Sequence, residues 1–155
     1  MKVRIEHLCG HTATADITGP NTHDQRDRKA DSLASQPCPD CSRAERDAAR
    51  QQQAKAAAAT ATEHGWPPLT GSEKQVAWAE QLRAAAIAEM GERLTARLDP
   101  DTAQRAHDCW TDAALRRTDA SWWIDHRDRP LASVTSLVLT AEERRVLNEM
   151  TGTSR

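Results

Sequence analysis

The chain of 155 residues contains no Phe and no Tyr, and its large aliphatic residues are few, with Leu, Ile and Val together numbering 20. Alanine supplies 27 of the 59 hydrophobic residues, so any hydrophobic core must be thin, and the five Trp residues must contribute much of it. A core this small commonly needs a metal ion or another cross-link. The length allows one compact domain or two small ones.

An excess of charge of one sign is also missing. The formal net charge is −2, which excludes a protein that binds nucleic acid through bulk positive charge. No apolar run approaches the roughly 20 residues of a membrane helix. The first apolar residues, Val3 and Ile5, are separated by a charge, so we expect no signal peptide. These absences predict a cytoplasmic protein, in which paired cysteines bind metal more often than they form disulfides.

Two short motifs carry the chemistry that the sequence does contain. Cys9 and His11 flank Gly10, and Cys38 and Cys41 form a C-x-x-C pair. Each motif can fill two corners of a tetrahedron from one turn of backbone, which is the arrangement of a structural zinc site. We therefore predict that Zn²⁺ is bound by these three sulfurs and one imidazole. Four protein ligands leave no open position for a substrate or an activated water, which argues against zinc catalysis.

Other interpretations of these residues remain open at this point. Cys38 and Cys41 could form a thioredoxin-like redox pair, although the βαβ context of that motif is missing, or the cysteines could be incidental. His7 competes with His11 as the fourth ligand. We favour His11, because it lies beside Gly10 within the turn, whereas His7 lies on the preceding strand.

The first 42 residues are predicted to form the zinc-bearing module. Apolar residues alternate with polar ones on both sides of the Cys-Gly-His turn, which predicts a β-hairpin. Residues 19–24 are expected to be a loop and residues 25–35 a short polar helix. Ser42 and Glu45 have the spacing of a capping box and would begin the next helix.

The arrangement resembles the small zinc-ribbon proteins of actinobacteria and of their phages and plasmids. The resemblance is carried by Cys9-Gly10-His11, by Cys38-Pro39-Asp40-Cys41, by residues 69–80 (LTGSEKQVAWAE) and by residues 120–125 (ASWWID). It implies a zinc ribbon at the start and a helical remainder, and little about activity. The Ser-x-Lys-Gln helix start is also similar to short helices in the tails of some bacterial topoisomerases.

Residues 43–68 are predicted to join two domains. Residues 43–62 contain no large apolar side chain, so we expect an exposed spacer helix, with a partly disordered linker as the alternative. Pro67 and Pro68 end any helix there. The fold class that we expect is α+β, mostly α: a zinc-ribbon hairpin in residues 1–42, this spacer helix and linker, and a small helical bundle in residues 69–155.

The last domain should contain at least three helical stretches. Ser72 and Thr140 each begin a capping box, and a break near Thr118 is expected to divide the stretch over 101–127. Residues 131–139 are predicted to form a buried strand or an extended connector, and residues 151–155 to fray. An apolar stripe and a face of small residues should form the core. They are Val76, Ala79, Leu82, Ala86, Met90 and Leu94, and Ala103, Ala106, Trp110, Ala113 and Ala114.

Several other residues have both a functional and a structural interpretation. Trp78, Trp122 and Trp123 are candidates for binding a partner, although core packing is the stronger expectation for the adjacent pair. Lys74 and Arg83 could contact phosphates, but we expect solvated surface charges.

No residue is assigned a catalytic role. His107-Asp108 and Asp125-His126 would stand about 27 Å apart on one unbroken helix, too far for an acid–base pair. The break near Thr118 could bring them together, but we do not expect that it does. We expect Cys109 to be a buried thiol without a partner.

The function that we expect is that of a non-enzymatic zinc-binding adaptor module linked to nucleic acid or nucleic-acid machinery, by analogy with other zinc ribbons. The alternative is a protein of a phage or plasmid that binds and inhibits a host protein. A small enzyme ranks last.

Overall fold

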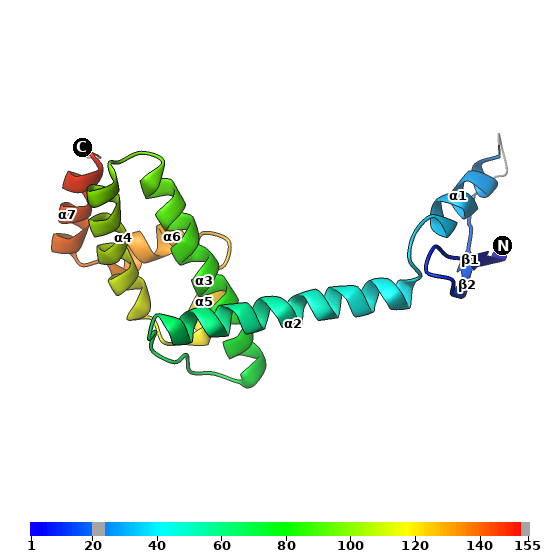
Figure 1. Ribbon diagram of the computed structural model, residues 1–155, viewed down its shortest axis with the longest axis horizontal. Helices are drawn as coiled ribbons and strands as arrows, with labels where there is room; N and C mark the ends of the chain where they lie inside the picture. Colours follow the sequence, from blue (N-terminus) through cyan, green and yellow to red (C-terminus); the bar gives the residue numbers. More distant parts are fainter. Residues whose placement is uncertain (20–23, 153–155) are drawn as a thin grey trace. The chain divides into compact units, whose positions relative to one another are not determined.

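The computed structural model describes residues 1–19 and 24–152 and has the expected fold class, an N-terminal two-stranded hairpin followed by helices (Figure 1). The chain divides into two compact units, Met1–Gln52 and Gln53–Arg155. Residues 20–23 of the predicted loop and residues 153–155 of the predicted frayed end lie outside the described residues. None of the helices in the described part combines the length and apolar character needed to cross a bilayer.

The first unit contains the predicted hairpin. Strands β1 (Lys2–Glu6) and β2 (Thr12–Asp16) pair antiparallel, with Val3 opposite Ala15 and Ile5 opposite Ala13. Helix α1 (Gln25–Ala34) packs on β1, as the polar helix expected over 25–35. Because side chains alternate along a strand, this register places Val3 and Ile5 on one face and the charged residues on the other.

Helix α2 (Pro39–Glu63) begins earlier than predicted. Ser42 lies within the helix, so its capping-box spacing with Glu45 has no capping role. The main-chain N–H of Ser42 donates to the carbonyl of Cys38, so the helix already begins at the C-x-x-C turn. Pro39 is suited to the first helical position, where a missing N–H costs no hydrogen bond.

The predicted exposure of α2 holds for only part of its length. Every residue from 43 to 53 is exposed, but Ala57 and Ala61 are buried in the second unit. Their methyl groups allow close packing where larger side chains would not fit. The end of α2 is therefore part of a folded unit rather than a free spacer.

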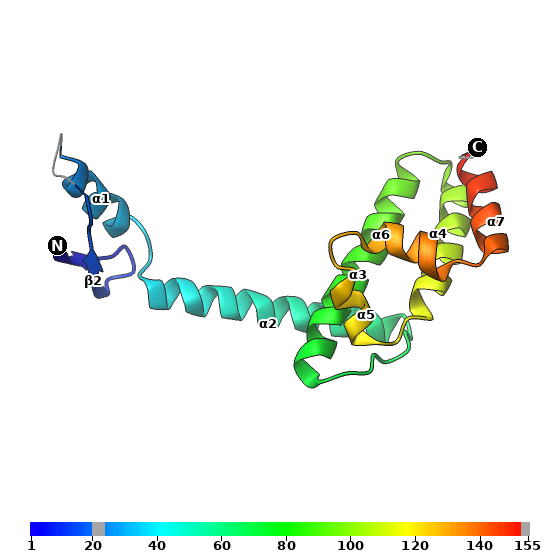
Figure 2. The same ribbon diagram turned by 180° about the vertical axis from the view of Figure 1, so that it is seen from behind.

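The second unit is built on α3 (Glu73–Thr95), which packs against α4 (Pro100–Leu115) and α5 (Ala120–Asp125). Helix α7 (Ala141–Thr151) lies beside α4 in both views (Figures 1 and 2). The capping boxes predicted at Ser72 and Thr140 are both present, and the break between α4 and α5 is where the sequence predicts it.

The small-residue face of α4 is confirmed as core. Ala103, Ala106, Trp110, Ala113 and Ala114 are all buried. The indole N–H of Trp110 donates to the Thr135 hydroxyl at 3.1 Å, so its polar edge is satisfied inside the core.

The strand or extended connector predicted over 131–139 is wrong. This segment forms α6 (Pro130–Ser133) and a turn of π-helix, η1 (Val134–Val138). In the described part of the chain the sheet consists of β1 and β2, and residues 131–139 belong to no strand. The Arg144 guanidinium donates to the carbonyls of Thr135, Ser136 and Leu139, which the wide π-turn leaves without a regular helical partner.

The solvated position expected for Arg83 is also wrong. This side chain is fully buried and donates to the carbonyl of Pro67 at 2.9 Å and to the Glu80 carboxylate at 3.2 Å. Its guanidinium carbon lies 5.2 Å from the centre of the Trp66 ring. Burial lowers the pKa of Arg83, and the Glu80 charge opposes that shift. Arg83 thus attaches the proline linker to α3.

We expect Arg83→Ala to lower the free energy of unfolding of the second unit by about 3 kcal/mol, because it leaves the Glu80 carboxylate and the Pro67 carbonyl without their donor. Urea unfolding followed by Trp fluorescence measures this loss. The matched control is Arg93→Ala, which removes an exposed pair with Glu89 and should cost below about 0.5 kcal/mol. Equal effects of the two variants would contradict the structural role of Arg83.

A second ion pair joins α4 to the start of α7. The Arg116 guanidinium makes two hydrogen bonds of 2.8 Å to the Glu143 carboxylate, which also accepts from the main-chain N–H of Thr140. The Arg116 guanidinium, followed by that N–H, lowers the pKa of Glu143 to about 2. Because the folded pKa lies below the unfolded value of about 4.5, the pair stabilises the fold above that pH.

The Arg116–Glu143 pair predicts that the difference in unfolding free energy between the wild-type chain and Glu143→Gln depends on pH. Glu143→Gln keeps an acceptor for the cap but loses the charge, so it should cost about 1 kcal/mol at pH 7. That cost should shrink as the pH falls from about 4.5 to about 2, since the wild-type carboxylate is then protonated too. Urea unfolding across this pH range tests the prediction, with Glu149→Gln at an exposed 4.0 Å pair as the control. A cost that does not change with pH would contradict it.

Candidate metal centre

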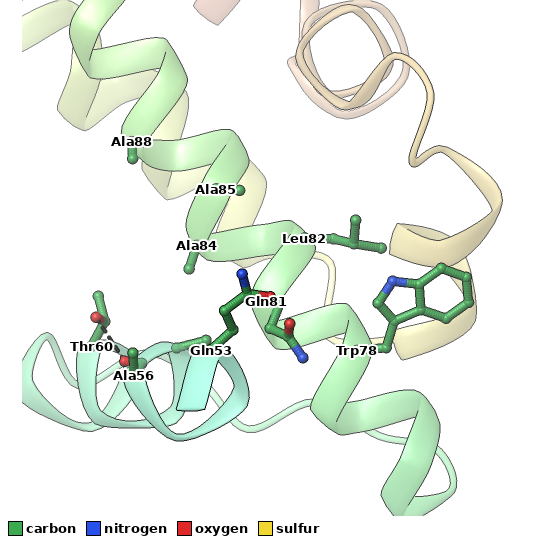
Figure 3. A pocket seen from close by; sticks show the side chains of 10 residues that line it. Gln53, Ala56, Thr60, Trp78, Gln81, Leu82, Ala84, Ala85 and Ala88 are labelled. Atoms are coloured by element: carbon green, nitrogen blue, oxygen red, sulfur yellow. Dashed lines mark hydrogen bonds between the residues drawn. The ribbon is translucent and has the colours of Figure 1, made fainter. Parts of the chain in front are cut away.

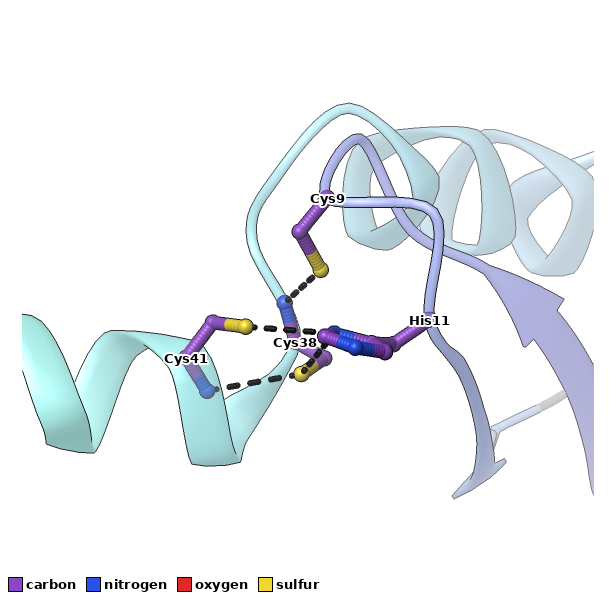
Figure 4. A group of neighbouring side chains, drawn as sticks. All are labelled: Cys9, His11, Cys38 and Cys41. Carbon is purple, nitrogen blue, oxygen red and sulfur yellow. Dashed lines mark hydrogen bonds between the residues drawn. The ribbon is translucent and has the colours of Figure 1, made fainter.

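Four side chains converge in the first unit. Cys9 and His11 lie in the turn between β1 and β2, Cys38 immediately precedes α2, and Cys41 lies in its first turn (Figure 4). Gly10 has a φ of 77°, a left-handed conformation that favours glycine, and this lets the turn aim both of its neighbours at one point. The structure thus brings together all four residues predicted as ligands.

The spacing of their donor atoms fits a tetrahedral ion. The three Sγ atoms and the His11 ring nitrogen all lie within 4.8 Å of one another. His11 Nδ1 is 3.2 Å from Cys41 Sγ and 3.8 Å from Cys38 Sγ. A tetrahedron with metal–sulfur bonds of about 2.3 Å has edges of about 3.8 Å, so shifts of about 1 Å or less complete the site. The group could hold a metal ion.

The two histidines have different surroundings. His11 directs Nδ1 toward the sulfurs, whereas His7 is buried and places its Nδ1 3.1 Å from the carbonyl oxygen of Gln36. Since a carbonyl only accepts, His7 donates there and joins the end of β1 to the segment before α2. This arrangement supports His11 as the fourth ligand and gives His7 a packing role.

Main-chain donors surround the sulfurs. The N–H of Cys38 donates to Cys9 Sγ at 3.2 Å, and the N–H of Cys41 donates to Cys38 Sγ at 3.4 Å. The Cys38 N–H, followed by the main chain of His11, lowers the pKa of Cys9 to about 6. The neighbouring Cys38 sulfur, followed by burial, raises the pKa of Cys41 to about 12. A cation bound here would displace the remaining thiol protons.

The redox interpretation of Cys38 and Cys41 finds less support in this geometry. The C-x-x-C pair does lie at the start of a helix, but no strand of the described residues follows that helix, because the sheet there contains β1 and β2 alone. Two further donors, Cys9 and His11, face the same point. Such convergence is expected of a metal centre and is not needed for a disulfide.

The candidate partner-binding tryptophans have different environments. Trp123 is fully buried, and its indole N–H donates to the carbonyl of Arg117, so it belongs to the core and offers no surface to a partner. Trp122 is half-buried and stacks on His126 at 4.3 Å. Trp78 is 45% exposed, with the Arg127 guanidinium 5.9 Å from its ring. Trp78 is therefore the most accessible of the three.

The remaining histidines and the fourth cysteine have structural surroundings. His107 donates through Nε2 to the carbonyl of Ile87 and lies above Gly91, where α3 and α4 approach closely. His126 donates through Nδ1 to the carbonyl of Trp122. Burial, followed by the charge of Glu143, raises the pKa of Cys109, so this half-buried thiol is not activated as a nucleophile.

A groove in the second unit was not predicted. It has a volume of about 620 Å³ and lies between the end of α2 and α3 (Figure 3). None of its lining residues is charged: Gln53, Ala56, Ala57, Thr60, Trp78, Gln81, Leu82, Ala84, Ala85 and Ala88. The signal available in the sequence was the spacing of small and apolar residues by three and four along both helices. Alanine contributes so little apolar area that the face of α3 toward α2 could not be distinguished from its neighbours.

Compared with family models, with curated proteins and with solved structures, the chain matches none. The assignment of the site therefore rests on its geometry and donor chemistry.

The four-residue centre predicts distinct outcomes for two neighbouring histidines. His11→Ala removes a ligand and should lower metal affinity by more than the 10–100-fold typical of changes outside the ligand set. His7→Ala should retain one ion per chain. Co²⁺ titration, followed by the absorption of tetrahedral thiolate ligation, measures both affinities. Cys109→Ser is the control for the loss of a thiol elsewhere. Loss of Co²⁺ binding in His7→Ala, with binding retained in His11→Ala, would show that His7 rather than His11 is the fourth ligand.

Proposed function

We propose that the chain is a non-enzymatic zinc-binding adaptor module. The observation that carries the proposal is the cluster of Cys9, His11, Cys38 and Cys41, whose donor atoms lie within 4.8 Å of one another. Three thiolates and an imidazole are soft donors that suit Zn²⁺, and four of them make a closed structural site. Such ligands need reduced thiols, which supports a cytoplasmic location.

Zinc in this position would hold a recognition surface in place. Leu8, directly beside Cys9, is 76% exposed, and a large apolar side chain held on a cross-linked turn suits contact with another molecule. By analogy of fold, the partner is nucleic acid or nucleic-acid machinery. The exposed face of the hairpin carries Lys2, Arg4, Glu6 and Asp16, two charges of each sign. Balanced charge favours a protein component of that machinery over a bare phosphate backbone.

A second candidate is a protein that binds and inhibits a host protein, as expected of a phage or plasmid product. The groove between the end of α2 and α3 favours it. Trp78 and Leu82 provide apolar contact area, and the lining carries no charge. A matching occupant is the apolar face of an amphipathic helix, because such helices lie in uncharged grooves of this kind.

Metal content and salt dependence test the first proposal. The purified chain should contain one zinc ion, and chelation should unfold the first unit, because a structural zinc contributes on the order of 10 kcal/mol. Direct contact with DNA would produce an affinity that falls steeply with salt. A zinc-free chain with an intact hairpin would overturn the zinc module. DNA binding that is steeply salt-dependent would show that the partner is nucleic acid itself rather than a protein.

Charge placed in the groove tests the second candidate. Ala85→Glu introduces a carboxylate into the groove, whereas Ala77→Glu places the same change at an exposed position of α3 outside the lining. The amount of protein captured from a host lysate through the groove should fall at least tenfold with Ala85→Glu and stay unchanged with Ala77→Glu. Equal capture by both variants would exclude the groove as the binding surface.

A further inference from the structure

Two of the four candidate ligands form the beginning of α2. The carbonyl of Cys38 accepts the first hydrogen bond of the helix, from the N–H of Ser42, and Cys41 lies within the same turn. Residues three apart on a helix lie on the same side of it. Both sulfurs face the same point when this turn is helical, so an ion bound by both stabilises the helical form of the turn.

The next part of α2 has little else to hold it. Every residue from 43 to 53 is exposed, and the buried residues of the helix, Ala57 and Ala61, lie beyond this stretch. Its ion pairs, Arg43 with Asp40 and Arg50 with Asp47, are exposed and three residues apart. Such pairs stabilise a helix by only about 0.2–0.5 kcal/mol each. The stretch is rich in good helix formers, but isolated helices of about this length are marginal in water.

We infer that metal binding at the cluster controls helix formation in the first half of α2, residues 39–53. This inference rests on the proposed zinc site and adds a conformational consequence to it. A helical turn at Cys38 and Cys41 that is separate from the rest of α2 would need its own nucleus, which is costly. Extending one continuous helix from Ala57 back to the ligands avoids that cost, so ligation and helix formation are coupled.

The coupling has a reciprocal consequence. If the ion stabilises helix in 39–53, then a change that weakens this helix should also weaken binding of the ion, and by the same factor where the metal-free stretch is not helical. The effect should be seen at exposed positions that are far from the ligands along the helix and touch none of them. Ala48 and Ala49 are such positions, because both are exposed and lie in the second turn after Cys41.

Hydrogen exchange of the full chain measures the first consequence. Amides of residues 43–53 should exchange at least about tenfold faster after zinc is removed by chelation, with the largest change nearest Cys41. Amides of α3 are the internal control and should be unchanged. Equal protection of 43–53 with and without zinc would overturn the inference, because the helix would then form without the ion.

Affinity measurements test the reciprocal consequence independently. Each Ala→Gly change in an exposed helix interior weakens the helix by about fourfold to fivefold, so Ala48→Gly combined with Ala49→Gly should lower Co²⁺ affinity about 20-fold. Ala77→Gly, at an exposed position of α3, should leave it unchanged. An affinity of the double variant within twofold of the wild-type value would show that the helix and the site are independent.

These measurements separate the inference from the proposal on which it rests. If the wild-type chain binds one Co²⁺ or Zn²⁺ per molecule but exchange and affinity show no coupling, the zinc module stands and the helix control is wrong. If the wild-type chain binds no ion at all, the proposed zinc module itself fails. Unchanged Trp fluorescence, which reports the second unit because all five Trp residues lie there, verifies that this unit of the double variant is folded.

Discussion

The convergence of three sulfurs and an imidazole is the constraint that relates the hairpin turn to the start of α2 in the first unit. The buried side chains of that unit in the described structure are Ile5, Ile17, His7 and Cys38, which is too small a core to hold a hairpin and a helix together by apolar burial alone. The four converging residues connect the turn between the strands to the start of α2. A bound cation would turn this proximity into a cross-link, and small domains with little core commonly depend on such a link.

The second unit solves the same shortage of large apolar residues differently. Alanines on α3 and α4 let the helices approach closely, and Trp110 of α4 and Trp123 of α5 are fully buried in the same core. The polar edge of each indole finds an acceptor, the Thr135 hydroxyl in one case and the Arg117 carbonyl in the other. The unit therefore reaches dense packing with few large side chains, and each of them carries a larger share of the stability than in an ordinary core.

Arginine side chains supplement this packing where the backbone is irregular. Arg83 donates to the proline linker from inside the protein, and Arg144 donates to three carbonyls around the π-turn. In both places the chain has carbonyls that regular secondary structure does not satisfy, and a guanidinium has enough donors to serve several acceptors at once. Residues that would be surface charges in a protein with a larger core thus act here as parts of the fold.

Local signals in the sequence were sufficient for the features that depend on neighbouring residues. Alternation identified the hairpin, the boxes at Ser72 and Thr140 identified two helix starts, and ligand spacing identified the four residues that converge. The same kind of signal failed at Ser42, because the helix begins at Pro39, where the second pair of candidate ligands lies. It also failed over residues 131–139, where an apolar run is compatible with a strand and with a helix.

Residue types at short spacing along the chain were enough to predict the fold class, the hairpin, several helix starts and the four residues that converge. Contacts made in the folded chain were needed to show that Arg83 and Trp123 are buried, that His7 faces Gln36 rather than the sulfurs, and that α2 and α3 enclose an uncharged groove. The physical reason is that burial and partner choice depend on contacts between residues far apart in the chain, and alanine-rich helices present several nearly equivalent faces among which only packing selects.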